Sequence, residues 1–212
     1  MSSDVAASYA RRADEYIERL GSMSTVHPAD LQLVTSWADA VTGPVLDAGC
    51  GPGHWTAHLA GRGIDARGVD QVPGFIEHAR RSHPGVRFAV GRVEDLTEFS
   101  GSVGGVLAWY SLIHHDPAGL QRALAEFARV LRPGGGLLLG MVTGPVLERF
   151  DHAVVSAYRW PMEALSDEVR GAGFEVIETH TRTGIGYRPH GALVARVPGI
   201  GGAFRPRGRM GT

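Results

Sequence analysis

Two hydrophobic spacings alternate along the chain. Apolar residues three or four positions apart, as in residues 2–20 and 117–131, are typical of amphipathic helices. Short continuous apolar runs, as in Val103 to Trp109, are typical of buried strands. The pattern predicts helices over 2–20, from a cap at Asp30 to Ala38, and over 54–60, 73–81, 117–131 and 160–172. It predicts strands over 44–48, 65–70, 86–90, 103–109, 137–142, 174–179 and 193–197, with a turn over 132–136.

The order of these elements predicts an α/β fold. Apolar strands that alternate with helices form parallel sheets covered on both faces, so we expect a single doubly wound sheet. The chain divides into an N-terminal helical cap over 1–43, a core domain over 44–197 and a mobile tail rich in glycine and arginine over 198–212. Ligands of such sheets bind beyond the carboxyl ends of the strands.

Composition and charge exclude several functions. The chain contains no lysine, which removes the P-loop lysine of nucleotide triphosphatases and any Schiff-base lysine. A net charge of -1 gives no general attraction to nucleic acid or to an anionic membrane. Cys50 is the only cysteine, and His54 and His58 have no third ligand near them in sequence, so no metal site is expected. With neither a signal peptide nor a long apolar run in the sequence, we expect a cytoplasmic protein.

The first predicted strand leads through Asp47 into a glycine loop, Gly49 to Gly53. This loop reads G-x-G-x-G, whereas a dinucleotide fingerprint requires a glycine where the chain has His54. Asp47 would repel a pyrophosphate and attract an ammonium group. Asp70 ends the second strand and can accept both hydroxyls of an unphosphorylated ribose. S-adenosylmethionine has an ammonium group and a ribose but no phosphate, so it fits this pattern.

Class I S-adenosylmethionine-dependent methyltransferases share an ordered set of motifs, and four segments of this chain resemble them. The segments are VLDAGCGPGHWTAHLA, RGVDQVPGFIEHARR, GGVLAWYSLIHHDP and RVLRPGGGLLLG. The similarity spans about residues 44–180. It implies a Rossmann-like sheet of about seven mostly parallel strands with a reversed C-terminal hairpin and helices on both faces. It also implies S-adenosyl-L-methionine as the cofactor.

The resemblance assigns the residues that would hold the methionine and ribose parts of the cofactor. Asp47, Gly49 and Gly51 would hold the methionine end, Asp70 would bind the ribose, and Gln71 would lie beside the adenine. These assignments place the cofactor across the tips of the first two strands.

The adenine and the sulfonium require further groups. Family members often carry an aspartate where this chain has Arg92, so the backbone of Val93 or the side chain of Glu94 would serve the adenine instead. Trp109 and Tyr110 end the fourth strand and should face the sulfonium, because an aromatic face attracts a cation.

The acceptor should lie beyond the fourth strand, where His114 and His115 follow the motif. The resemblance also implies that Tyr9, in the helix before the sheet, closes over the cofactor. A histidine titrates near neutral pH and can take a proton from an acceptor, so His114 is the predicted base. Because they are adjacent in sequence, His114 and His115 should point in different directions. Residues 143–160 lie where family members place substrate-binding insertions, which can act as a lid. The predicted acceptor contacts are His115, His152, Tyr158, Arg159 and His190.

These features predict transfer of a methyl group from S-adenosylmethionine to a small-molecule acceptor, whose reacting O, N or C atom the sequence leaves open. A monomer or a homodimer is expected. A nucleic-acid acceptor is not expected, because residues 109–112 lack the D/N-P-P-Y/F motif of amino-methylating enzymes. Two alternatives are kept: a non-catalytic protein that binds S-adenosylmethionine or S-adenosylhomocysteine, and an NAD-dependent oxidoreductase on the same type of sheet.

Overall fold

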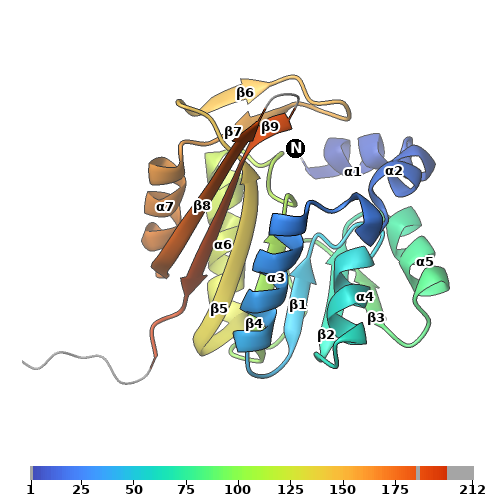
Figure 1. Ribbon diagram of the computed structural model, residues 1–212, viewed down its shortest axis with the longest axis horizontal. Coiled ribbons are helices and arrows are strands. Elements are labelled where there is room, and N and C mark those ends of the chain that lie inside the picture. The colour runs from blue at the N-terminus through green and yellow to red at the C-terminus, as the bar shows by residue number, and fades with distance from the viewer. Residues whose placement is uncertain (1, 185–186, 200–212) are drawn as a thin grey trace, which may run out of the picture.

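The computed structural model describes residues 2–184 and 187–199 and is built around a seven-stranded sheet (Figure 1). Across the sheet the strands run in the order β3 (Arg87–Val90), β2 (Ala66–Asp70), β1 (Val45–Ala48), β4 (Val103–Trp109), β5 (Leu131–Val142), β9 (Tyr187–Arg196) and β8 (Glu175–Gly184). β9 is antiparallel to both of its neighbours, and the other pairs are parallel. The predicted doubly wound sheet with a reversed C-terminal hairpin is therefore confirmed.

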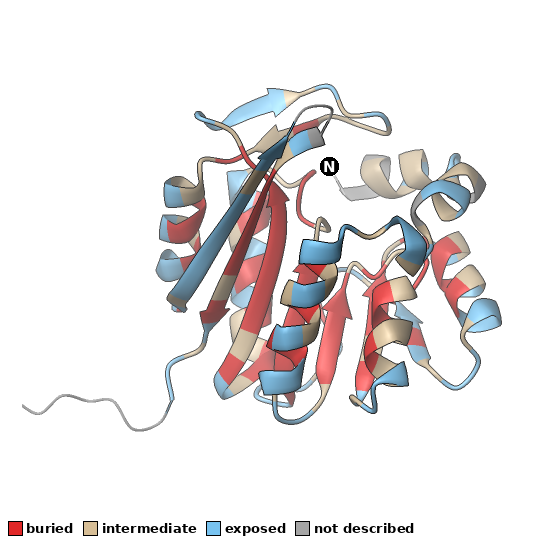
Figure 2. Cartoon of the chain, in the orientation of Figure 1, coloured by how far each residue is buried: buried red, intermediate tan, exposed pale blue. Residues whose placement is uncertain are grey.

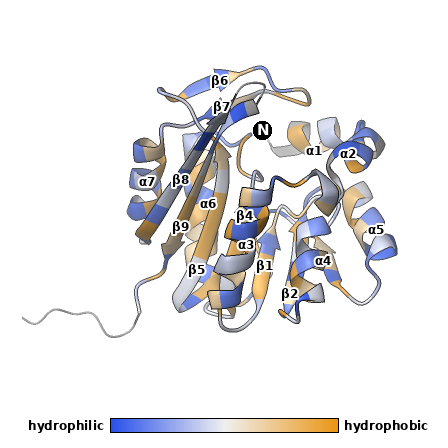
Figure 3. Ribbon diagram, in the orientation of Figure 1, coloured by the Kyte–Doolittle hydropathy of each residue, from blue (hydrophilic) through white to orange (hydrophobic). Residues whose placement is uncertain are grey.

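Helices cover both faces of the sheet, as the hydrophobic spacing requires. The helices are α1 (Ser2–Ala10), α2 (Ala13–Leu20), α3 (Pro28–Ala40), α4 (His54–Gly61), α5 (Pro73–Ser82), α6 (Pro117–Val130) and α7 (Met162–Gly171), with a short 3₁₀ turn η1 (Met23–Thr25). The central strands are buried and apolar, whereas β8 forms an exposed edge and the outer helix surfaces are hydrophilic (Figures 2 and 3). None of the helices in the described ranges has both the length and the apolar character that crossing a membrane requires.

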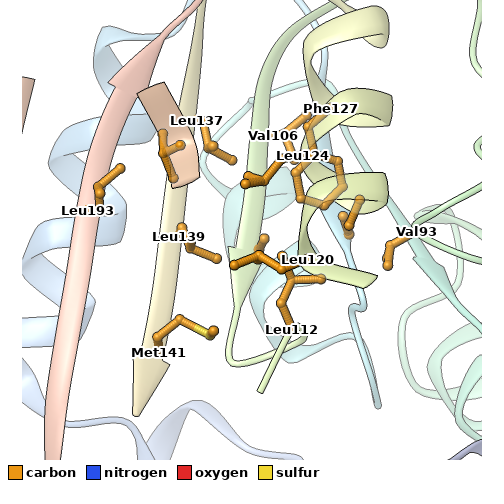
Figure 4. Packing of buried hydrophobic residues seen from close by; sticks show 14 of the residues in the cluster. Val93, Val106, Leu112, Leu120, Leu124, Phe127, Leu137, Leu139, Met141 and Leu193 are labelled. Atoms are coloured by element: carbon orange, nitrogen blue, oxygen red, sulfur yellow. The ribbon is translucent and has the colours of Figure 1, made fainter. Parts of the chain in front are cut away.

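The core divides at the sheet because side chains alternate between its faces along each strand. Leu107 and Leu138 pack with Trp37 of α3 on one face. Val106 and Leu137, one position earlier in each strand, pack on the opposite face against α6 (Figure 4). Burial of a large apolar side chain stabilises a fold by about 1.5–3 kcal/mol, so these two clusters hold β1, β4 and β5 rigidly beneath the strand tips.

Residues 2–20 form two helices, so the predicted single helix is wrong. The break lies at Arg12, whose φ of −122° and ψ of 18° leave the helical region. The Arg12 side chain donates to the Ala153 carbonyl and pairs with Glu15 at 3.0 Å. These contacts link the second helix to a distant loop, which hydrophobic spacing does not report.

The predicted cap of the next helix is also wrong. His27 is the N-cap of α3, and its Nδ1 accepts the N–H of Ala29 at 3.1 Å. Asp30 lies within the first turn of α3 and is buried. Its carboxylate is therefore free to bind a residue from another part of the chain.

The predicted turn over 132–136 lies inside β5, which begins at Leu131. The pairing of β4 with β5 is irregular between Val103 and Gly105. At Gly104 a Cβ would lie 1.9 Å from the Thr42 carbonyl oxygen, so this backbone approach requires glycine. Glycine and proline, which indicate a turn in sequence, here accommodate close packing within a strand.

The region 143–160 contains a small hairpin, β6 (Glu148–Phe150) and β7 (Ala157–Arg159), which the hydrophobic pattern did not predict. α7 begins at Met162 rather than at Trp160, because Trp160 bridges to Thr143 and Pro161 caps the helix. Of the predicted tail, residues 200–212 lie outside the described residues, and the division into segments at 43 and 197 stays a prediction.

Candidate functional site

Two adjoining cavities lie at the carboxyl ends of β1, β2 and β4. The small cavity, of about 80 Å³, is lined on one side by Asp70, Gln71 and Glu94. The large cavity, of about 520 Å³, extends past Asp47 toward His152. Both share a common wall, which consists of Tyr9, Tyr16, Gly49, Gly51, Trp109 and Tyr110. This is the sheet edge where the strand order reverses from β1 to β4, and where ligands of doubly wound sheets bind.

The glycine loop has backbone angles that only glycine adopts readily. Gly49, Gly51 and Gly53 have φ values of 81°, 53° and 89°. A Cβ on Gly49 would lie 2.2 Å from the Cβ of Ser111, so the loop passes directly against the end of β4. The loop thus forms the floor between the two cavities and turns the chain into α4.

Asp70 is held at the tip of β2 by backbone donors. Its two oxygens accept the N–H of Gly51 at 2.9 Å and the N–H of Val72 at 2.8 Å. Burial raises the pKa of this carboxyl, and these backbone hydrogen bonds oppose the rise. Each carboxylate oxygen can accept a second hydrogen bond, so Asp70 has capacity left for two hydroxyl groups in the small cavity.

Asp47 is the more deeply buried acid. Its carboxylate accepts the hydroxyl of Thr56 at 2.7 Å and is 2% exposed. Burial raises the pKa of Asp47 from 3.8 to about 7, and the nearby Asp70 adds to the rise. A cationic group in the large cavity would offset both effects, because an opposite charge favours the ionised form. Thr56 was missed in the sequence, although it lies only nine residues after Asp47 on the helix that follows the loop.

Glu94 and His115 form a pair in the small cavity. Nε2 of His115 lies 2.9 Å from Oε1 of Glu94, and this hydrogen bond is the main reason that the pKa of Glu94 falls to about 2. Arg92 adds to the same effect from 3.6 Å. His115 lines the small cavity with Glu94, Gln71 and Val93, and its contact with the acceptor stays a prediction. Both adjacent histidines line the small cavity, but their rings point apart: His115 contacts Glu94, whereas His114 contacts Tyr9 and lies 5.2 Å from the ring of His152, which lines the large cavity.

Both ring nitrogens of His114 are engaged. Nδ1 lies 2.9 Å from the Ser156 carbonyl, which can only accept, so Nδ1 carries the hydrogen. Nε2 therefore accepts the hydroxyl of Tyr9 at 2.8 Å. Burial lowers the pKa of His114, which favours the neutral ring with an unprotonated Nε2. A proton leaving an acceptor would reach His114 through the Tyr9 hydroxyl.

Tyr110, directly after β4, has a strained backbone conformation. Among the described residues other than glycine it alone has a positive φ, 58°. His190 stabilises this conformation of Tyr110. Its Nδ1 hydrogen-bonds the Tyr110 hydroxyl, and its ring centre lies 5.4 Å from that of Trp109. Nε2 of His190 lies 3.8 Å from a carboxylate oxygen of Asp30. The guanidinium of Arg182 donates hydrogen bonds to both carboxylate oxygens of Asp30. Sequence reasoning missed Asp30 and Arg182, because 152 residues separate them and neither lies in a motif.

Of the three acceptor contacts predicted in the β6–β7 region, one lines a cavity. His152 lines the large cavity, with its ring 5.2 Å from that of His114. Tyr158 and Arg159 lie outside the residues that line the two cavities. The backbone N–H of Tyr158 donates to Ile113 at 2.7 Å, and Arg159 pairs with Glu148 at 3.1 Å. Neither residue lines a cavity in this structure, so their contact with the acceptor stays a prediction that the geometry does not support.

The described residues include no group of three or more His, Cys, Asp or Glu side chains arranged to hold a metal ion.

The chain is similar in sequence and fold to known methyltransferases. The family model described as "Methyltransferase domain" matches residues 45–135. A Mycobacterium tuberculosis protein named as an uncharacterized methyltransferase is 41% identical over 96 residues, which are 44% of this chain and 37% of that protein. This chain thus spans just over a third of the length of that relative. The malonyl-[acyl-carrier protein] O-methyltransferase of Serratia marcescens is 26% identical over 225 residues, or 98% of this chain and 81% of that protein.

Solved structures repeat the fold. The Burkholderia thailandensis 1,6-didemethyltoxoflavin-N1-methyltransferase, with bound 1,6-didemethyltoxoflavin and S-adenosylhomocysteine, matches with a TM-score of 0.77 at 20% identity. That match covers 93% of this chain and 88% of the other. Residues 45–135 match a methyltransferase domain. The glycine loop and both acidic strand tips of this methyltransferase domain lie within the matched residues 45–135, whereas His152 and His190 lie beyond them.

Proposed function

We propose that this methyltransferase domain transfers a methyl group from S-adenosylmethionine to a small-molecule acceptor. The observation that carries the proposal is the pair of buried acids at neighbouring strand tips, Asp47 in the large cavity and Asp70 in the small one. Asp47 suits an ammonium group and Asp70 suits two ribose hydroxyls. The described residues that line the small cavity include no arginine to neutralise a phosphate. The cleft therefore fits a cationic nucleoside without phosphates.

The residues of the small cavity suit the nucleoside half. Gly49 and Gly51 leave room for it against the loop, and Glu94, fixed by His115, offers a carboxylate oxygen near the position proposed for the adenine. The faces of Trp109 and Tyr110 border both cavities, where they would stabilise a sulfonium through cation–π attraction. When bound, S-adenosylmethionine supplies an electrophilic methyl group on sulfur.

The chain's contribution to the reaction is chiefly orientation. Holding two reactants in line can supply about 7–11 kcal/mol of the barrier in well-oriented systems. Tyr9 and His114 provide a route for a proton where the acceptor has one to lose, with Tyr9 donating to His114 as it receives from the acceptor. The proposed base is thus His114 acting through Tyr9.

A thermal-shift comparison tests whether the protein binds S-adenosylhomocysteine or NAD. Because a ligand that binds only the folded state stabilises it by about 2.7 kcal/mol at 100 times its Kd, S-adenosylhomocysteine should raise the Tm by several degrees. NAD should leave the Tm unchanged. A shift with NAD and none with S-adenosylhomocysteine would favour an oxidoreductase instead.

Transfer of a labelled methyl group to a panel of small acceptors separates an enzyme from a non-catalytic binder. Binding of S-adenosylhomocysteine with no transfer to any acceptor would favour the binder. The relatives do not supply the acceptor, since their names give acceptors of different kinds. A cytoplasmic location and a monomeric or homodimeric state are proposed from the sequence alone.

A further inference from the structure

The charges around the large cavity are unbalanced. Its described lining contains the four arginines Arg12, Arg19, Arg182 and Arg188 and the three carboxylates Glu15, Asp30 and Asp47. Arg182 is neutralised by Asp30, and Glu15 is shared by Arg12 and Arg19 at 3.0 and 3.4 Å. Asp47 lies at the cofactor end, where the proposed ammonium group would pair with it. The half of the cavity beyond the cofactor therefore keeps a surplus of positive charge.

Arg188 is the cation without a carboxylate partner. No described carboxylate lies within 4.0 Å of its guanidinium, which instead stacks 5.3 Å from the ring centre of Phe150. Four other arginines of the same end of the molecule, Arg12, Arg19, Arg159 and Arg182, all have acidic partners. A guanidinium presents planar donors that match a carboxylate, so an unpaired one at a ligand cavity favours an anionic ligand.

His152 supplies a second donor beside Arg188. Its ring lies 6.3 Å from that of Phe150, the same ring on which Arg188 stacks. The backbone N–H of Val154 points to Nδ1 of His152 at 3.4 Å, so the neutral ring carries its hydrogen on Nε2. Burial lowers the pKa of His152 to about 4, with smaller contributions from His114 and Arg188. A carboxylate placed between Arg188 and His152 would relieve the repulsion that these groups exert on a protonated ring.

We propose that the acceptor of the methyl group is a small acid whose carboxylate binds between Arg188 and His152. This inference rests on the proposed function and names the substrate class of the same cleft. The body of the acid would lie against the apolar part of the lining, Ile113, Val142 and Val154, with the aromatic faces of Trp109 and Tyr110 toward the cofactor. The His114 ring lies 5.2 Å from that of His152 and hydrogen-bonds Tyr9, which lines the large cavity.

Matched ligands test the proposal on the full chain. Binding of benzoate, 1-naphthoate, their amides and benzylamine would be measured by calorimetry or ligand-observed NMR, with and without S-adenosylhomocysteine. At least one acid should bind about tenfold or more tightly than its amide, as a charge-assisted hydrogen bond implies, and benzylamine should bind most weakly. The preference for the acid should weaken as salt is added.

Variants show whether Arg188 causes the preference. Arg188→Gln should bring acid and amide to within about twofold, and Arg188→Lys should keep part of the preference, because it keeps the charge without the planar fork. Arg149 is an exposed arginine of β6 outside the cavity lining, so the control variant Arg149→Gln should keep the full preference for the acid. The proposal is overturned if neither acid binds, if an amide or the amine binds as tightly as the acid, or if Arg188→Gln retains the preference.

The affinity for S-adenosylhomocysteine, measured on the same samples, keeps the two proposals apart. If S-adenosylhomocysteine binds and the acids do not, the acid acceptor is wrong and the methyl donor is not. If the acids bind and S-adenosylhomocysteine does not, the proposed function is wrong while the anion site at Arg188 stands.

Discussion

Replacing Asp47 by asparagine should stabilise the cofactor-free protein and abolish its affinity for the cofactor. Burial raises the pKa of Asp47 from 3.8 to about 7, so ionising this group opposes folding. Each pKa unit corresponds to about 1.4 kcal/mol, so the ionised carboxylate costs the folded state up to about 4 kcal/mol above pH 7. Asparagine has nearly the same shape and can still accept the Thr56 hydroxyl, but it cannot ionise.

The pH dependence follows from the sign of the shift. Between pH 4 and 7 the folded protein holds a proton on Asp47 that the unfolded chain has lost, so the contribution of Asp47 to stability falls as pH rises through this window. Below pH 4 both states are protonated and the cost disappears. The stability advantage of Asp47→Asn over wild type should therefore grow by about 2 kcal/mol from pH 5.5 to pH 8.

Urea denaturation of cofactor-free wild type and Asp47→Asn at pH 5.5, 6.5 and 8 measures this difference, provided that the slope of unfolding free energy against urea is unchanged. The matched control is Asp167→Asn, whose carboxylate is 69% exposed on α7 and should give a small change that does not vary with pH. An advantage that stays constant with pH, or a loss of stability at pH 8, would refute the assignment of a costly buried charge to Asp47. Calorimetry with S-adenosylhomocysteine reports the accompanying loss of affinity.

Other substitutions probe the same cleft. Asp70→Ala should weaken the binding of S-adenosylhomocysteine at least ~10-fold in calorimetry, because two ribose hydroxyls lose a charged acceptor; an unchanged Kd contradicts the role. His114→Ala should lower turnover more than cofactor affinity, whereas His115→Ala, which releases Glu94, should raise the cofactor Kd; the reverse pattern would exchange their roles. Gly49→Ala should cost about 2 kcal/mol or more in urea unfolding, since its φ of 81° and the contact with Ser111 exclude a Cβ, and a neutral effect would show that the loop relaxes.

Local sequence was sufficient for the elements that recur in this class of sheet. The apolar runs of β1, β2, β4 and the start of β3 were predicted within one or two residues. Prediction from local sequence failed where a contact with a distant segment overrides the conformational preference of the residues. The first helix breaks at Arg12, which binds a loop 141 residues away, and Gly136 continues a strand because it pairs with Gly105 of β4.

Some residues of the cleft could likewise be identified from the sequence, and others only from the structure. The order of residues alone determined the glycine loop and the acids Asp47 and Asp70, because each follows directly from a strand whose end must lie at the sheet edge. Tertiary structure decided that His115 serves Glu94 and that Asp30 pairs with Arg182, since these partners are 21 and 152 residues apart. Burial, which sets the charge and pKa of each group, arises only when distant segments pack together, and no spacing along the chain encodes it directly.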